Sequence, residues 1–372
     1  MNIYEQIDKI TEINSEKILS AFIKNKVSSN HFQGTTGYGY DDFGRDNLER
    51  VYADIFGKED ALVRHSFVCG TNAISTALFA VLRPNDIMVS MTGKPYDTLL
   101  PVIFGEDGRD IGSLKDFGVR YSEDENDLKS AKVCYIQRSR GYTTRKALSV
   151  SDINDIIKNA KEKNPNIITI VDNCYGEFVS AAEPDADLLI GSLIKNPGGG
   201  IARTGGYITG KKELITLCAN RHTSAGIGKE VGCSLEMLRE MYLGLFLAPQ
   251  TVSNALKTAH FASDLFREKG YETTPPNGDI ITSIVFNDKD KLIKFCKGIQ
   301  NNSPVDSHLT PEPWAMPGYD CDVIMAAGTF TMGASIELSA DAPIRPPYVC
   351  YLQGGLSFEM SKITIMKAMQ SI

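Results

Sequence analysis

Short apolar runs alternate with helical patterns over the first 210 residues, and this alternation constrains the fold more than any other feature. Four runs are too short for helices and too apolar for an exposed surface, so they predict buried strands. They lie at residues 87–90, 133–137, 167–171 and 188–191. Residues 153–163 show helical spacing, and Ser149 with Asp152 predicts a capping box before them. The alternation indicates an α/β fold with a mostly parallel central sheet covered by helices.

The chain has 372 residues, a length that predicts two domains. Apolar residues at helical spacing begin the chain, so we expect residues 1–45 to form an N-terminal arm and helix used in assembly. We expect a large domain over residues 46–248 and a smaller C-terminal α+β domain over residues 249–372.

The second half of the chain shows a long helical pattern over residues 235–267, which we expect to be interrupted at Pro249. Strands are expected at residues 279–287 and 334–338. A terminal helix is expected from Ser357.

The acidic composition limits the class of partner. The net charge of −7 and the isoelectric point near 5.4 argue against a nucleic-acid or anionic-membrane surface. No apolar stretch approaches the ~18 residues of a membrane helix, and the N-terminal residues lack the apolar core of a signal peptide. We therefore expect a cytoplasmic protein with a small-molecule partner. The eight cysteines form no CxxC pair and the histidines are not clustered, so no metal site or disulfide framework is predicted.

Lys195 is the candidate catalyst, because the apolar run at 188–191 delivers it into a loop with Pro197 and three glycines. Glycines remove side chains and allow positive φ, so we expect this loop to let the backbone approach something bulky. A lysine on an arbitrary loop is usually solvated. Here, however, the preceding apolar run ends at Asp172, and ligands of open α/β sheets bind beyond strand ends.

A lysine and an aspartate in this arrangement suit pyridoxal phosphate. The lysine amine forms a Schiff base with a carbonyl, and we expect burial or neighbouring cations to lower its pKa and free the nucleophile. A buried carboxylate such as that of Asp172 keeps the pyridine nitrogen protonated, which that cofactor needs as an electron sink. The pair therefore predicts a covalent cofactor site.

Three further features have both a functional and a plainer interpretation. Gly70, Thr71 and Asn72 form a glycine turn that opens a helix, which is either a phosphate cradle or an ordinary strand–helix corner. Tyr96, near a strand end, either stacks on a planar cofactor or belongs to the core. Arg345, between prolines, either captures a carboxylate or forms a structural salt bridge.

Three long segments resemble a known family. They are DNCYGEF, GSLIKNPGGGIARTGGYI and SIELSADAPIRPPYVCYLQGG. Together with the order of glycine turn, aromatic residue, aspartate and lysine, they resemble the methionine γ-lyase-like family, also called aluminium-resistance proteins, within the fold-type I pyridoxal-phosphate enzymes. The resemblance covers nearly the whole chain. It implies a transferase-like fold and a carbon–sulfur lyase that converts a sulfur amino acid into thiol, ammonia and a 2-oxo acid.

The resemblance also implies residue roles. Lys195 would form the Schiff base, with Tyr96 and Asp172 as the other catalytic residues. Arg345 would hold the substrate α-carboxylate. Tyr40 and Arg45 would reach the phosphate in a neighbouring subunit, which implies a homodimer or homotetramer. The expected cofactor-binding residues are Gly70, Thr71, Asn72, Tyr96, Asp172, Ser192, Lys195, Tyr40 and Arg45.

Alternatives within and beyond this class stay open. Ile194 precedes Lys195, where the better-known cystathionine-type enzymes have threonine, so one hydroxyl group that would bind the phosphate is missing. The substrate of those enzymes is therefore not assigned to this chain. The same lysine and aspartate would serve an aminotransferase or an aldolase. A third interpretation is a stress-related protein that binds the cofactor without turnover. The particular sulfur amino acid, and β- against γ-elimination, are also open.

Overall fold

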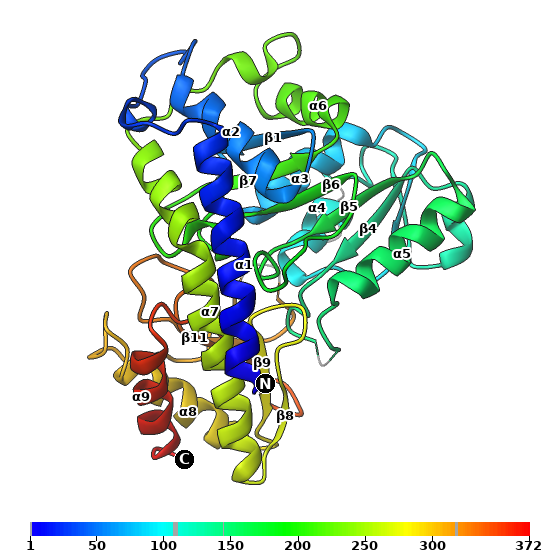
Figure 1. The fold of residues 1–372 in the computed structure, drawn as a ribbon. Helices are drawn as coiled ribbons and strands as arrows, with labels where there is room; N and C mark the ends of the chain where they lie inside the picture. Colours follow the sequence, from blue (N-terminus) through cyan, green and yellow to red (C-terminus); the bar gives the residue numbers. More distant parts are fainter. Residues whose placement is uncertain (1, 107–110, 144, 317–318) are drawn as a thin grey trace.

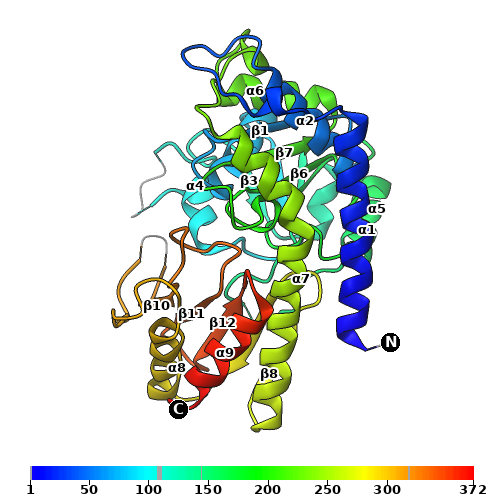
Figure 2. The same cartoon turned by 60° about the vertical axis from the view of Figure 1, so that its left-hand side comes forward.

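The computed structural model describes residues 2–106, 111–143, 145–316 and 319–372 and contains two sheets (Figure 1). A seven-stranded sheet with its helices forms the larger part, and a five-stranded sheet forms the smaller part. Helix α7 (Leu238–Glu268) extends from the larger part to the smaller part. Helix α1 (Ile3–Lys24) packs along α7 (Figure 2).

The large sheet is mostly parallel, as expected. Its strand order is β1-β7-β6-β5-β4-β2-β3, in which β3, β2, β4, β5 and β6 pair in parallel and β7 is antiparallel to both of its neighbours. The strands are β1 (Asp60–Arg64), β2 (Ile87–Ser90), β3 (Arg120–Ser122), β4 (Val133–Gln137), β5 (Ile168–Asp172), β6 (Leu188–Ser192) and β7 (Gly206–Gly210).

Helices cover both faces of this sheet because its strands are apolar on both sides. On β4, Cys134 and Ile136 pack on the face covered by α1, α2 and α5, whereas Val133 and Tyr135 pack on the face covered by α3, α4 and α6. The expected capping box at Ser149 is present. These helices are α2 (Phe43–Phe56), α3 (Gly70–Val81), α4 (Leu100–Phe104), α5 (Val150–Lys163) and α6 (Lys212–His222).

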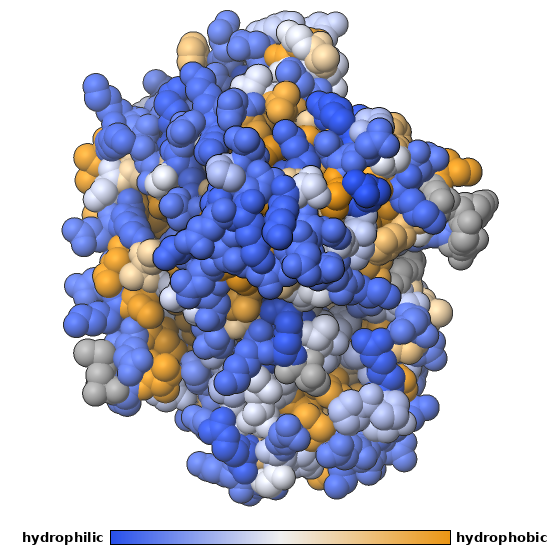
Figure 3. All heavy atoms as spheres, turned by 90° about the vertical axis from the view of Figure 1, so that its right-hand side faces the viewer, coloured by the Kyte–Doolittle hydropathy of each residue, from blue (hydrophilic) through white to orange (hydrophobic). Residues whose placement is uncertain are grey.

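One face of the molecule is largely polar. The face in Figure 3 is covered mostly by hydrophilic side chains, with hydrophobic residues in small separate groups. In the described parts of the chain, no helix combines the length and the apolar character that crossing a membrane requires.

The smaller sheet is antiparallel, with the order β10-β11-β12-β9-β8. Helices α8 and α9 pack against it, and all of these elements follow α7 in the chain (Figure 2). The elements are β8 (Glu272–Thr274), β9 (Ile281–Val285), α8 (Lys289–Asn301), β10 (Val323–Ala326), β11 (Ser339–Pro343), β12 (Val349–Gln353) and α9 (Phe358–Met369).

Two sequence expectations in this half are wrong. Helix α7 continues through Pro249, because packing on both sides holds it despite one missing backbone donor. The domain boundary expected at 248/249 therefore falls inside a helix. Residues 334–338 form no strand: the Ile336 N–H donates to the Ile194 carbonyl at 3.1 Å, and the Glu337 carboxylate accepts from two backbone N–H groups. Strand β11 begins only after them.

The glycines after Lys195 serve packing within the protein, which corrects the expectation of a ligand beside them. A Cβ on Gly199 would lie 2.3 Å from the Gly244 carbonyl oxygen, and a Cβ on Gly244 would lie 2.2 Å from the Gly198 carbonyl oxygen. On Gly200 it would lie 2.4 Å from Leu356. The loop after the candidate catalyst therefore lies backbone to backbone against α7.

Gly244→Ala tests this contact, because the same change is normally favourable by about 1 kcal/mol in a helix interior. Here the added methyl group meets backbone that cannot rotate away, so we expect the free energy of unfolding to fall by about 1–3 kcal/mol. Denaturant unfolding would measure it, with Leu243→Ala on the exposed side of α7 as the control. An unchanged or increased stability in Gly244→Ala would contradict the close approach.

Candidate active site

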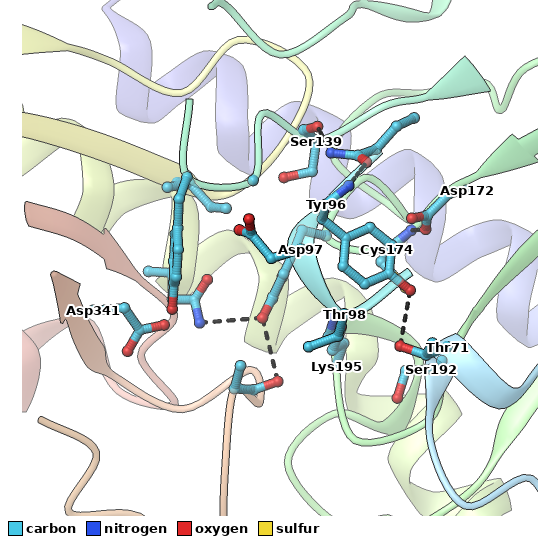
Figure 4. Close-up of a pocket in the computed structure, with 18 of the residues that line it drawn as sticks. Thr71, Tyr96, Asp97, Thr98, Ser139, Asp172, Cys174, Ser192, Lys195 and Asp341 are labelled. Atoms are coloured by element: carbon cyan, nitrogen blue, oxygen red, sulfur yellow. Dashed lines mark hydrogen bonds between the residues drawn. The ribbon is translucent and has the colours of Figure 1, made fainter. Parts of the chain in front are cut away.

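A cavity of about 270 Å³ lies between the ends of the parallel strands and the smaller sheet (Figure 4). It receives side chains from β4, β5, β6, the start of α3 and the strands β11 and β12. The structure brings six of the predicted site residues together along its wall. They are Gly70, Thr71, Tyr96, Asp172, Ser192 and Lys195.

Strand pairing explains why Asp172 and Lys195 meet. Strands β5 and β6 are parallel neighbours, with Asp172 opposite Ile190, so both chains leave the sheet at the same edge. Asp172 is the last residue of β5 and is buried. Its Oδ1 accepts from the Cys174 N–H at 3.1 Å and its Oδ2 accepts from the Tyr135 hydroxyl at 3.4 Å. These two donors fix the carboxyl group in the cavity wall.

The electrostatics of this pair differ from the sequence expectation. The half-buried Lys195 places its Nζ 4.1 Å from the centre of the Tyr175 ring. Burial lowers the pKa of Lys195, but Cys174, Tyr175 and Asp172 raise it more, so that the pKa lies well above its ordinary value. Burial raises the pKa of Asp172, and Lys195 offsets part of that rise. The expected lowered lysine pKa is therefore wrong for the protein alone, because acidic groups and not cations surround the amine.

The start of α3 offers donors to an anion. Cys69 precedes the helix and makes no side-chain cap bond, so the first helical N–H groups have no such partner, and Gly70 and Thr71 line the cavity. The buried Ser192 Oγ has no hydrogen-bond partner among the described residues. A Cβ on Gly70 would lie 3.2 Å from the Ser192 Cβ, so glycine lets the two approach. An uncapped helix end beside an unpartnered hydroxyl suits a phosphate group.

Tyr96 and Asn72 occupy different positions around that helix end. The Tyr96 hydroxyl and Thr71 Oγ1 are hydrogen-bonded at 2.8 Å, and the Tyr96 N–H donates to Gln137 Oε1 at 2.8 Å (Figure 4). Asn72 does not line the cavity, since its Oδ1 accepts from the Val68 N–H at 3.3 Å. The structure therefore does not bring Asn72 to the cavity wall with Tyr96.

Besides Asn72, three more predicted residues lie outside the cavity wall. The partly exposed Arg345 forms an ion pair with Asp320 at 2.8 Å. Tyr40 is exposed on its loop. Arg45 is buried and donates to the carbonyls of Gly39 and Gly232, at 2.7 and 2.9 Å. The structure thus does not bring Tyr40, Arg45 or Arg345 to the other six.

Several wall residues were missed by sequence reasoning. Gln353 Nε2 donates to the Tyr175 hydroxyl at 3.1 Å, which in turn donates to the Ala334 carbonyl. Asp341 enters from β11, and Tyr142 follows β4. Cys174 also lines the wall. Tyr175, Asp341 and Gln353 all lie within the three segments that carried the family resemblance, which was the available signal.

Solved structures with low sequence identity share this fold. A pyridoxal-5'-phosphate-dependent protein, YhfS of Escherichia coli, superposes with a TM-score of 0.66 at 16% identity, covering 98% of this chain and 97% of that one. The mixed seven-stranded sheet with a separate antiparallel sheet is therefore the fold-type I architecture of pyridoxal-phosphate enzymes.

Closer relatives identify the family. The methionine gamma-lyase family profile matches residues 1–372. A structure from Listeria monocytogenes, described as a candidate cystathionine beta-lyase involved in aluminium resistance, is 50% identical over 100% of this chain and 96% of that one, with a TM-score of 0.95. A structure from Clostridium novyi, described as a carbon–sulfur lyase involved in aluminium resistance, is 48% identical over 99% of this chain and 92% of that one, with a TM-score of 0.93. This chain belongs to the methionine gamma-lyase family and is a lyase.

A buried polar network supports the Lys195 loop from behind. Asn196 donates to the Glu177 carbonyl at 2.9 Å, and the Tyr207 hydroxyl donates to Glu177 Oε1 at 2.9 Å. Glu177 Oε2 has no partner among the described residues. Burial raises the pKa of Glu177 to about 8, and the nearby Glu183 adds to the rise.

Glu177→Gln tests this protonation state. The pKa of Glu177 in the folded protein, about 8, exceeds the ordinary value of 4.5. The folded protein is therefore most stable below pH 4.5, where Glu177 is protonated, and it loses this stability as the pH rises from 4.5 through 8. Glutamine stays neutral, so we expect the variant to match the wild type near pH 4.5 and to be more stable by roughly 2–4 kcal/mol near pH 9. Denaturant unfolding across this pH range measures the difference, with the exposed Glu213→Gln as a control. A difference that does not change with pH would contradict the shift.

Proposed function

We propose that this protein is a pyridoxal-phosphate-dependent carbon–sulfur lyase that acts on a sulfur amino acid. Elimination with addition of water would yield a thiol, ammonia and a 2-oxo acid. The observation that supports it is the meeting of Lys195 and Asp172 in one cavity, beside an uncapped helix end and the unpartnered Ser192 hydroxyl. The Listeria relative is described as a candidate cystathionine beta-lyase and the Clostridium relative as a carbon–sulfur lyase, and both descriptions agree with this reaction.

The donor set fits pyridoxal phosphate. Gly70, Thr71 and Ser192 would hold the phosphate through backbone and hydroxyl donors, because a helix N-terminus and a free hydroxyl both favour an anion. The Asp172 carboxylate would hold a proton on the pyridine nitrogen. Lys195 would hold the aldehyde carbon through its amine. When bound, this cofactor accepts the electron pair left after an α-proton is removed.

Lys195 and Tyr96 are the proton-moving groups of this proposal. Lys195 Nζ, once displaced by the substrate amine, would take the α-proton as general base. Its pKa is high in the protein alone, so the amine must give up a proton before it can hold the cofactor or act as a base. The hydroxyl of Tyr96, or the Lys195 ammonium, would then protonate the leaving sulfur. The Tyr96–Thr71 hydrogen bond positions that hydroxyl.

Substrate orientation and assembly extend the proposal. Arg345 would bind the substrate α-carboxylate, for which it must exchange its ion pair with Asp320. Tyr40 and Arg45 would act on the site of a neighbouring subunit in a cytoplasmic homodimer or homotetramer. Arg45 already binds two backbone carbonyls of its own chain, so that role requires it to leave them.

Lys195→Ala tests the proposal directly. We expect loss of the visible absorbance of protein-bound cofactor, together with loss of thiol, ammonia and 2-oxo acid release from cystathionine and methionine, because no other group can replace the amine. The matched control is Lys362→Ala, which removes another lysine that lies over an aromatic ring, that of Phe261, and should keep both signals. Activity that persists in Lys195→Ala would refute the assignment. Turnover that releases no thiol and requires an added keto acid would point to transamination.

Ser192→Ala tests the phosphate site. Loss of one hydroxyl donor to a charged group costs about 1.5–3 kcal/mol, so we expect the dissociation constant for pyridoxal phosphate to rise by about ten- to a hundredfold. Titration of apoprotein by absorbance measures it. Ser253→Ala is the control, since Ser253 is also buried with an unpartnered Oγ but lies on α7, outside the cavity wall. Equal affinities for the two variants would exclude Ser192 from phosphate binding.

A further inference from the structure

A second carboxyl group, that of Asp341, lines the cavity, and none of the roles above uses it. Asp341 lies on β11 of the smaller sheet and is only 2% exposed. Figure 4 shows it on the opposite side of the cavity from Asp172. Its Oδ1 has no hydrogen-bond partner within the described residues, and the nearby Tyr142 hydroxyl lowers the pKa of this carboxyl group. Buried acceptors are normally hydrogen-bonded, so this oxygen suits a ligand that donates a hydrogen bond.

Aromatic rings surround the same part of the cavity. The Tyr142 ring centre lies 5.2 Å from that of Tyr351, in a stacked arrangement, and 5.6 Å from that of Tyr319. All three tyrosines line the cavity beside Asp341. Tyrosine faces attract cations, and a carboxylate behind them adds a full negative charge. This wall therefore has the chemistry of a site for an organic cation.

The charge balance of the cavity supports the same conclusion. The cation that acts on the Asp341 carboxyl group in the structure is Lys195. Burial raises the pKa of Asp341 to about 7, and Lys195 opposes that rise. If Lys195 holds the cofactor, its charge is no longer free to compensate Asp341. A cation supplied by the substrate would then take its place.

We propose that Asp341 and Tyr142 bind a protonated amine on the leaving half of the substrate. The preferred substrates are then thioether amino acids whose departing thiol carries an ammonium group, and purely apolar thioethers are poor substrates. This inference rests on the proposed lyase function, which places the α-carbon near Lys195 and Asp172 and the leaving group toward the opposite wall. Asp341 is a specificity-determining residue in this scheme.

Asp97 is the competing carboxylate. It also lines the cavity and begins the short helical turn after Tyr96. Asp97 is less buried than Asp341, and while burial raises its pKa, the positive charge of Arg345 lowers it. Because Arg345 already stabilises the charge of Asp97, we expect Asp97 to attract a substrate cation less strongly than Asp341 does. Asp97→Asn therefore makes the same charge change in the same cavity and serves as the matched control.

The test uses two unreactive ligands that lack an α-amino group. They are 3-(2-aminoethylsulfanyl)propanoate and 3-(propylsulfanyl)propanoate, which differ only by an ammonium in place of a methyl group. Isothermal titration of the cofactor-loaded wild type should show about ten- to a hundredfold tighter binding of the ammonium ligand. Asp341→Asn should lose most of that preference, Tyr142→Phe should lose part of it, and Asp97→Asn should keep it.

Turnover of S-(2-aminoethyl)cysteine and S-propylcysteine completes the test. We expect the wild type to have the higher kcat/KM for S-(2-aminoethyl)cysteine, and the variants to change this preference as they change the binding preference. Equal or weaker binding of the ammonium ligand by the wild type overturns the inference without any variant. A preference that survives Asp341→Asn, or that disappears in Asp97→Asn, overturns it as well. If the ligands are discriminated but no thioether releases thiol, the lyase function fails while the Asp341 site stands.

Discussion

The charge pair of Asp172 and Lys195 is the interaction on which the rest of the site depends. Taking a carboxylate out of water costs several kcal/mol unless a cation and hydrogen bonds compensate it. Here Lys195, the Cys174 N–H and the Tyr135 hydroxyl provide that compensation. Both side chains reach one cavity because β5 and β6 are parallel neighbours that end at one edge of the sheet. The same edge receives the start of α3, so a helix N-terminus without a side-chain cap lies in the same cavity wall.

The lysine loop is held by main-chain contacts from both parts of the molecule. On one side Gly198 and Gly199 pack against Gly244 of α7, at distances that no side chain tolerates. On the other side Ile194 accepts from the Ile336 N–H of the segment before β11. The segment before β11 therefore contacts the lysine loop, while β11 and β12 contribute Asp341 and Gln353 to the opposite wall of the cavity. The complete cavity wall needs both sheets.

Most regular elements of the large sheet could be predicted from local pattern. The runs at 87–90 and 133–137 coincide with β2 and β4, because strands buried on both faces are continuously apolar. The errors arise where long-range contacts outweigh local preference. Residues 334–338 are apolar enough for a strand, but Ile336 bonds to the lysine loop. Pro249 was expected to interrupt a helix that packing holds together.

The sequence by itself determined the residue types of the site and their places at strand and helix ends. Asp172, Gly70 and Thr71 were recognisable because apolar periodicity marks where each element begins and ends, whereas Ser192 was expected only from the family resemblance. Only the tertiary structure decided which charges face one another. The high pKa of Lys195, the packing role of the glycines after it and the presence of Asp341 in the cavity all depend on contacts between segments distant in the chain. Periodicity encodes burial along one element, whereas electrostatic environment is set by distances through space.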